Sequence, residues 1–266
     1  MENLHVPATS FAAMAMSIVL SIGAPVALFF VVRKKYGKGI RPVLLGGAGF
    51  LLFSMILEQI LHAIVLRRGP DGSVALMQRP VLYMIYGALA AGLFEETARL
   101  VSFYILKKRC DGFGTALKHG IGHGGVEAAL IGGASLVGGM ALAIMLNTLG
   151  PQAMSQMGEP VFMQAQVIAA TQPVMLLVSG FERLFALGIQ ISLSMVMYYA
   201  VYKSRKLWLY PLAILLHALV DCPVALYQVG VITNMWLLEG IVLVSAVVLA
   251  GIAFMLHKKM EVQQKP

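Results

Sequence analysis

Charged side chains are scarce in this sequence: Asp, Glu, Lys and Arg make up 12% of it, and hydrophobic residues 59%. A soluble domain of 266 residues cannot bury so much apolar surface, so soluble globular classes are excluded and an integral membrane protein is indicated. Every backbone group in lipid must be hydrogen-bonded within its own segment. Long apolar runs therefore predict an all-α, polytopic transmembrane helical bundle.

Cysteine is rare as well. Cys110 lies in a basic loop and Cys222 in an apolar run, so a disulfide between them is not expected. The first apolar run lacks a preceding basic segment and an obvious cleavage site, which indicates a retained helix rather than a signal peptide. No fixed-period repeat is visible. Residues 1–266 are therefore expected to form a single integral membrane domain.

Seven apolar runs are long enough to cross a bilayer. They are roughly Ser10–Val32, Pro42–Leu66, Pro80–Leu106, His119–Leu146, Gln172–Tyr202, Leu207–Gln228 and Ile232–Leu256. Lys and Arg fill the first, third and fifth loops and the C-terminal tail, whereas the fourth and sixth loops have none. Because positive loops face the cytoplasm, the pattern predicts about seven spans, with the N-terminus outside and the C-terminus cytoplasmic. The second loop, with three arginines, is the exception.

The net charge of +8 does not indicate a nucleic-acid partner, because the basic residues lie in short loops that set topology. The partner that we expect is the lipid bilayer of a bacterial-type plasma membrane, which the chain crosses several times. The connection Asn147–Thr171 is interpreted as a plain surface loop, with a re-entrant or interfacial segment or a lid as the alternative. Eight glycines between positions 120 and 139 predict a closely packed fourth helix.

Two adjacent carboxylates, Glu95 and Glu96, lie near the middle of the run Pro80–Leu106, and Arg99 follows one turn after Glu95. An ionised side chain at bilayer depth costs on the order of 3 kcal/mol by insertion scales. Three such side chains together therefore need partners or a function. Adjacent carboxylates in a low dielectric cannot both stay ionised cheaply, so one is expected to be protonated or held by Arg99.

Further polar pairs occur at one-turn spacing, which puts both members on the same helix face. They are Glu58 with His62, His123 with Glu127, and His217 with Asp221; the fifth run adds Glu182, Arg183 and Gln190. At about 1.5 Å of rise per residue, the groups roughly 10–20 Å from the cytoplasmic interface are Glu95, Glu96, Glu127, Gln190, His217 and Asp221, with Arg99 and His123 slightly shallower. The exceptions in the outer half are Glu58, His62, Glu182 and Arg183. Taken alone, each pair is typical of a structural ion pair, but together they indicate a general base that acts on water.

The ordered set Glu95-Glu96-Thr-Ala-Arg99, GxGHGGxE ending at Glu127, Phe181-Glu182-Arg183 and His217-xxx-Asp221 resembles the YhfC-type intramembrane peptidases. That family is similar to the CAAX-prenyl-protease-like intramembrane proteases. The resemblance covers the third to the sixth span. It implies an intramembrane endopeptidase in which Glu95 or Glu96 activates water, His123 helps to hold the water, and His217 and Asp221 polarise the scissile carbonyl.

Accessory or structural roles in the site are expected for Arg99, Glu127, Gln190, Glu182 and Arg183. Because neighbours in sequence do not face one another on a helix, Glu182 and Arg183 each need a partner on another helix, and a buried clamp is the default interpretation for them. The chain departs from the family patterns at two points. The CAAX-type motif has one more residue before its arginine, so the choice of base between Glu95 and Glu96 stays open. YhfC-type sequences have a histidine near Gln190, and a glutamine cannot take a proton. Position 190 is therefore either dispensable or a cause of lower activity.

Several of these side chains are also potential metal ligands. His123 and His217, with Asp221 or Glu127, offer three ligands for Zn²⁺ with water as the fourth. The sequence has no HExxH motif, so no local signal indicates zinc. The glutamate mechanism requires no cofactor and is favoured by a modest margin, with Zn²⁺ as the alternative.

The sequence thus predicts a protease that hydrolyses a membrane protein or a lipidated peptide. Two other functions compete with it. Intramembrane acids and histidines also build the relays of a proton-coupled transporter or channel, although paired halves with interrupted helices are not seen. A non-catalytic membrane scaffold would keep the same polar cluster for packing.

Overall fold

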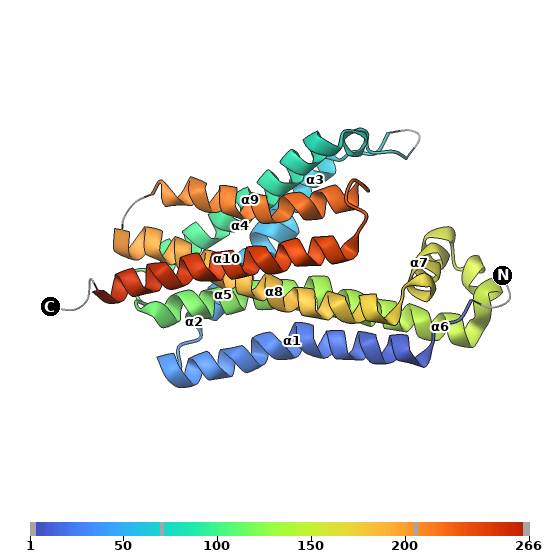
Figure 1. The fold of residues 1–266 in the computed structure, drawn as a ribbon, viewed down its shortest axis with the longest axis horizontal. Helices are drawn as coiled ribbons and strands as arrows, with labels where there is room; N and C mark the ends of the chain where they lie inside the picture. Colours follow the sequence, from blue (N-terminus) through green and yellow to red (C-terminus); the bar gives the residue numbers. More distant parts are fainter. Residues whose placement is uncertain (1–3, 70–71, 205–206, 263–266) are drawn as a thin grey trace. The chain divides into compact units, whose positions relative to one another are not determined.

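The computed structural model describes residues 4–69, 72–204 and 207–262, whose regular structure is helical (Figure 1). Its α-helices are α1 (Ala8–Tyr36), α2 (Arg41–Leu52), α3 (Gln59–Val65), α4 (Pro80–Leu106), α5 (Phe113–Glu127), α6 (Ser135–Gln156), α7 (Glu159–Ala170), α8 (Pro173–Tyr198), α9 (Leu209–Gln228) and α10 (Met235–Val262). A π-helical turn, Phe53–Glu58, joins α2 to α3, and another, Ala128–Ala134, joins α5 to α6.

Six of the seven expected spans are helices long and apolar enough to cross a membrane. They are Ala8–Tyr36, Arg41–Val65, Phe113–Gln156, Pro173–Lys203, Leu209–Gln228 and Met235–Lys258. The seventh, Pro80–Leu106, is helical over the predicted range as α4. It is not one of the six, because the charged residues near its middle lower its hydropathy.

The prediction of a plain loop over Asn147–Thr171 is wrong. Helix α6 continues to Gln156 through a kink at Gly150, and α7 follows after Gly158. Both glycines have positive φ angles, 80° and 110°, so Gly150 permits the kink within α6 and Gly158 permits the change of direction between α6 and α7. Pro160 lies in the first turn of α7, where a missing N–H is tolerated. In this segment, the prolines and glycines that suggest a loop lie instead at helix starts and bends.

The described residues divide into two compact units. Unit 1 comprises residues 4–27 and 127–184, and unit 2 comprises residues 28–126 and 185–262. In unit 1, α7 packs against α6 around buried Met154 and Ala165 (Figure 1). Asn147 on α6 forms two hydrogen bonds with the backbone of Val6, at 2.8 and 2.9 Å, and so fixes the segment before α1.

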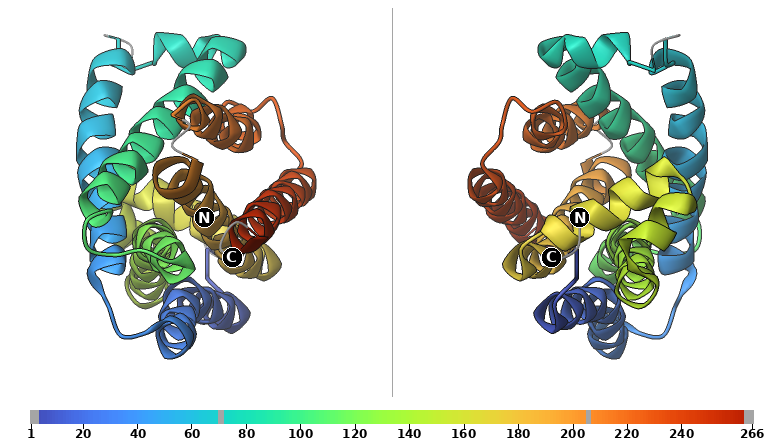
Figure 2. Two further views of the ribbon diagram at one scale, coloured as in Figure 1. Left: turned by 90° about the vertical axis from the view of Figure 1, so that its left-hand side faces the viewer. Right: turned by 90° about the vertical axis from the view of Figure 1, so that its right-hand side faces the viewer.

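Helix α4 is central to unit 2, because it packs against both α2 and α9, and α9 also contacts α10 (Figure 2). Close approach requires small residues. A Cβ atom at Gly92 of α4 would lie 2.7 Å from the carbonyl oxygen of Ile214 on α9, and one at Gly122 of α5 would overlap the Val43 backbone on α2. The expectation of close packing holds at Gly120, Gly122, Gly124 and Gly132, but Gly138 has open space.

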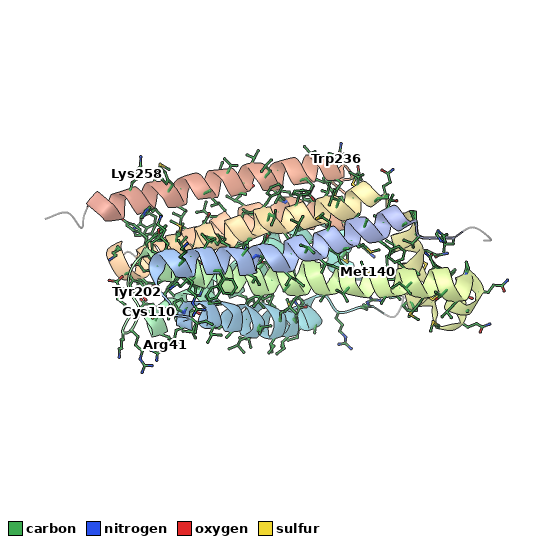
Figure 3. The ribbon with its side chains drawn as sticks, turned by 90° about the horizontal axis from the view of Figure 1, so that it is seen from below. Arg41, Cys110, Met140, Tyr202, Trp236 and Lys258 are labelled. Carbon is green, nitrogen blue, oxygen red and sulfur yellow. The ribbon has the colours of Figure 1, made fainter. Side chains whose placement is uncertain are left out.

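The ends of unit 2 differ in character. Figure 3 shows Arg41, Cys110, Tyr202 and Lys258 at one end and Trp236 at the other. The first and third loops, the end of the fifth span at Tyr202 and the C-terminal end of α10 are therefore on the same side of unit 2; Arg205 and Lys206 of the fifth loop lie outside the described residues. This arrangement is the one that the alternation of basic loops requires. Which side faces the cytoplasm stays a prediction.

Replacing Gly122 by alanine is expected to destabilise the protein, because the added methyl group meets the rigid backbone at Val43. Overpacking of this kind costs about 1–3 kcal/mol. Gly251→Ala is the matched control, since open space surrounds that position on α10, and alanine there favours the helix by up to about 1 kcal/mol. Thermal unfolding of both variants in detergent measures the difference. Equal melting temperatures would contradict the close contact between α5 and α2.

Candidate functional site

Helix α4 contributes three buried charged side chains within little more than one turn. Glu95, Glu96 and Arg99 are 7%, 0% and 0% exposed. Spacings of three and four residues put both carboxylates on the side of the helix that carries the arginine. Nη1 of Arg99 donates to Oε1 of Glu96, and Nη2 lies 3.5 Å from Oε2 of Glu95. Arg99 is therefore the counter-ion of both glutamates.

Two other helices of unit 2 bring polar side chains to Glu95. His123 of α5 places Nε2 at 2.8 Å from Oε2 of Glu95, and Gln190 of α8 donates from Nε2 to the same oxygen at 3.1 Å. The other end of the Gln190 amide, Oε1, accepts a hydrogen bond from Nη2 of Arg99. This close approach of α5 and α8 depends on Gly124, where a Cβ atom would lie 2.8 Å from Cβ of Gln190.

Helix α9 contributes His217 and Asp221, one turn apart. Nδ1 of His217 lies 2.9 Å from Oε1 of Glu96. Its other ring nitrogen, Nε2, lies 3.7 Å from Oε2 of Glu95 and 3.5 Å from Oδ2 of Asp221. The side chain of Asp221 is 31% exposed and that of His217 only 4%. Asp221 is thus the most accessible of the acidic groups in this cluster.

The cluster of Glu95, Glu96, Arg99, His123, Gln190, His217 and Asp221, called here the α4 cluster, has more carboxylates than cations. Three carboxyl groups face one guanidinium, and uncompensated ionised carboxylates are unfavourable in a low dielectric. The arrangement therefore favours a bound proton, a protonated histidine or a metal cation.

The donors of the α4 cluster are of the kind that a divalent metal ion binds, namely imidazole nitrogens and carboxylate oxygens. Nε2 of His123 and Nε2 of His217 lie 2.8 and 3.7 Å from the same oxygen of Glu95, and Nε2 of His217 lies 3.5 Å from Oδ2 of Asp221. A carboxylate on the second ring nitrogen orients a metal-binding histidine, and Glu96 provides this contact to His217. His123 differs, because its Nδ1 is buried and without a hydrogen-bond partner among the described residues.

Arg99 and Gln190 are the accessory residues of unit 2, and both contact Glu95 of the α4 cluster directly. Glu127, Glu182 and Arg183 belong to unit 1. There Arg183 forms ion pairs with Glu127, at 3.6 Å, and with its neighbour Glu182. These three residues thus form a partly buried group of ion pairs at the position where the sequence predicts a buried clamp for Glu182 and Arg183. Glu127 remains one turn from His123 along α5, as their spacing requires.

Two features of unit 2 go beyond the roles predicted from the sequence. Glu58 is buried and within electrostatic range of Glu95 and His217. Nε2 of His62 lies 3.3 Å from Oε1 of Glu58, and Nδ1 of the same ring lies 2.7 Å from the hydroxyl oxygen of Tyr86. The one-turn spacing in the sequence identifies Glu58 and His62 as a pair, but their predicted position in the outer half of the membrane favours a structural role. His119 is the second feature: it lies fully buried one turn before His123, with Nδ1 at 3.1 Å from Oγ of Ser194.

Comparisons with known proteins agree with the family resemblance. The model of the YhfC intramembrane metalloprotease family matches residues 16–242. The uncharacterized membrane protein YhfC of Bacillus subtilis (strain 168) is 34% identical over 239 residues, which cover 86% of this chain and 89% of the relative. No solved structure matches the chain.

These findings bear on activity, cofactor and location. The family name describes an intramembrane protease and implies a metal ion, without specifying which. The metal-free mechanism favoured from the sequence receives no support from that name. The helices and the bacterial relative identify a multi-pass integral membrane protein. On the match of both the family model and the relative, the chain belongs to the YhfC intramembrane metalloprotease family.

Proposed function

We propose that this protein is a metal-dependent intramembrane endopeptidase that hydrolyses peptide bonds of membrane-associated substrates at the α4 cluster. The observation that carries the proposal is the convergence of His123 from α5 and His217 from α9 on one carboxylate oxygen of Glu95. A buried carboxylate with two imidazoles beside it can take a proton from a water molecule and so activate that water as a nucleophile. A structural ion pair would need neither histidine.

His123, His217 and Asp221 would hold the metal, and their two nitrogens and one oxygen suit Zn²⁺. When bound, a divalent ion supplies Lewis-acid polarisation of the scissile carbonyl oxygen and of the attacking water. Glu96 has a positioning role, because its contact with Nδ1 of His217 leaves Nε2 of that ring free to bind. Arg99 in turn holds Glu96 in place.

Glu95 is the general base in this proposal, and Glu96 is not. Glu96 is fully buried and engaged by Arg99 and His217, whereas Glu95 retains 7% exposure. The contacts of Glu95 with its neighbours described above all involve Oε2, which leaves Oε1 to accept the proton of the attacking water. As the water oxygen bonds to the carbonyl carbon and the C–N bond breaks, Glu95 returns that proton to the leaving amine.

The depth of the site indicates the class of substrate. Glu95 lies eleven residues before Leu106, the last residue of α4, which corresponds to about 16 Å along the helix. A peptide bond cleaved there must enter the apolar part of the bilayer. The proposed substrate is therefore a membrane protein or a lipidated peptide that approaches from the cytoplasmic side.

Exchanging each glutamate for glutamine separates their roles. Glu95→Gln is expected to reduce cleavage by roughly 10²–10⁴, the usual contribution of a general base. Glu96→Gln is expected to cost about 10–100-fold, as for a residue that orients a ligand. New protein termini in membranes of expressing cells, identified by mass spectrometry, report cleavage of any membrane protein that serves as substrate. Glu159→Gln at the exposed start of α7 is the control. Cleavage by Glu95→Gln at the parent rate would contradict the mechanism.

Metal analysis of the purified protein tests the ligand set without any substrate. We expect about one equivalent of zinc in the parent and much less in His123→Ala and His217→Ala, because each loses one of three ligands. His62→Ala removes a histidine outside the α4 cluster and should leave the metal content unchanged. Absence of metal from the parent, or an equal loss in His62→Ala, would refute the assignment.

Gln190 is a positioning residue that needs both ends of its amide, since it donates to Glu95 and accepts from Arg99. Gln190→Leu is expected to lower kcat about tenfold or more with little change in KM, because a buried donor and acceptor lose their partners. Gln190→His, with one donor and one acceptor nitrogen, should recover part of this loss. If the leucine variant matches the parent in kcat, Gln190 has no such role.

A further inference from the structure

A cavity in unit 2 lies at its basic end, away from the α4 cluster. It is an open cavity with a volume of about 480 Å³, lined by the start of α2, the end of α4 and the turn that follows α4. Its lining combines four apolar residues with three cations: Leu44, Leu45, Ile105, Leu106, Arg41, Lys108 and Arg109. Figure 3 shows Arg41 and Cys110 together at this end of the unit.

The walls of this cavity are held in place by the helices. Oγ of Ser102 on α4 donates to the carbonyl oxygen of Leu45 on α2, at 3.3 Å, and Leu106 is buried in the core of unit 2. The backbone N–H groups of Arg109 and Cys110 both donate to the carbonyl of Leu106, at 2.8 and 2.9 Å. The turn that carries the cations is therefore fixed above the apolar walls.

The acidic residue closest in sequence to these cations is engaged elsewhere. Asp111 accepts a hydrogen bond from the hydroxyl of Tyr198 at 2.6 Å and lies 3.6 Å from Nζ of Lys203. Arg41, Lys108 and Arg109 are all exposed, and Arg41 begins α2, whose N-terminus adds partial positive charge. This end of the cavity thus attracts an anion.

The apolar walls indicate that the anion has a hydrocarbon part. Leu44 and Ile105 are 59% and 56% exposed, next to the cations. A free phosphate ion makes no use of such a surface, whereas an acyl chain lies along it. Basic pockets between transmembrane helices at the cytoplasmic side bind anionic lipid head groups.

We propose that this cavity binds an anionic phospholipid, with its phosphate on Arg41, Lys108 and Arg109 and an acyl chain along Leu44 and Ile105. The lipid would occupy the gap between α2 and α4, the helix that carries Glu95 and Glu96. The site is independent of the proposed peptidase chemistry, because none of its residues belongs to the α4 cluster.

Native mass spectrometry of the full chain in detergent tests this site. The probes are dioleoylphosphatidylglycerol, dioleoylphosphatidylcholine and inorganic phosphate. We expect the parent to retain phosphatidylglycerol in preference to phosphatidylcholine and to show no binding of inorganic phosphate. Lys108→Gln with Arg109→Gln should weaken phosphatidylglycerol binding roughly tenfold, from the loss of two charges at the head group. Lys34→Gln with Lys38→Gln removes two exposed charges, one in the last turn of α1 and one in the loop that follows, and should have little effect.

A second variant tests the apolar walls. Leu44→Gln with Ile105→Gln changes only exposed side chains, so folding is preserved, and the loss of acyl-chain contact should lower retention of both lipids. The proposal is overturned if the two charge-removal variants behave alike or if the wall variant binds like the parent. It is also overturned if inorganic phosphate displaces phosphatidylglycerol, because the site would then be one for free phosphate.

Discussion

A buried guanidinium that cannot lose its proton is the constraint on which the centre of this protein depends. Arg99 is fully buried on a helix within a largely apolar bundle, and an ion left without its partner in such surroundings costs about 3–5 kcal/mol. Glu96 provides one partner and Gln190 another, so α4 and α8 are joined through Arg99. The contact of Glu96 with His217 extends the same network to α9.

This network also explains the small residues of unit 2. Hydrogen bonds between side chains on different helices require that the backbones come close, and in lipid no hydrophobic force brings them together. Gly124 permits α5 to reach Gln190, and Gly92 permits α4 to reach α9 near His217. The polar cluster therefore depends on the glycines, because side chains can form short polar contacts at bilayer depth only where the helix backbones lie close together.

The sequence predicts the helices well because apolar runs in a chain with few charges leave little choice. It fails at Asn147–Thr171, where prolines and glycines have the composition of a loop but serve as helix starts and bends in α6 and α7. Depth estimates group Glu127 with Glu95 on one level of the bilayer. Depth does not predict the ion pair between Glu127 and Arg183 in unit 1, because depth says nothing about which helices are neighbours.

The sequence alone determined that α4 carries two carboxylates and an arginine on one side, since spacings of three and four residues have that result in any α-helix. The one-turn pairs His123–Glu127 and His217–Asp221 follow from the same periodicity. Only the tertiary structure distinguished Glu95 from Glu96. That difference arises from contacts between helices: His123 and Gln190 approach Glu95, whereas His217 and Arg99 enclose Glu96. Helical periodicity sets the face of each side chain, but packing decides which groups it meets.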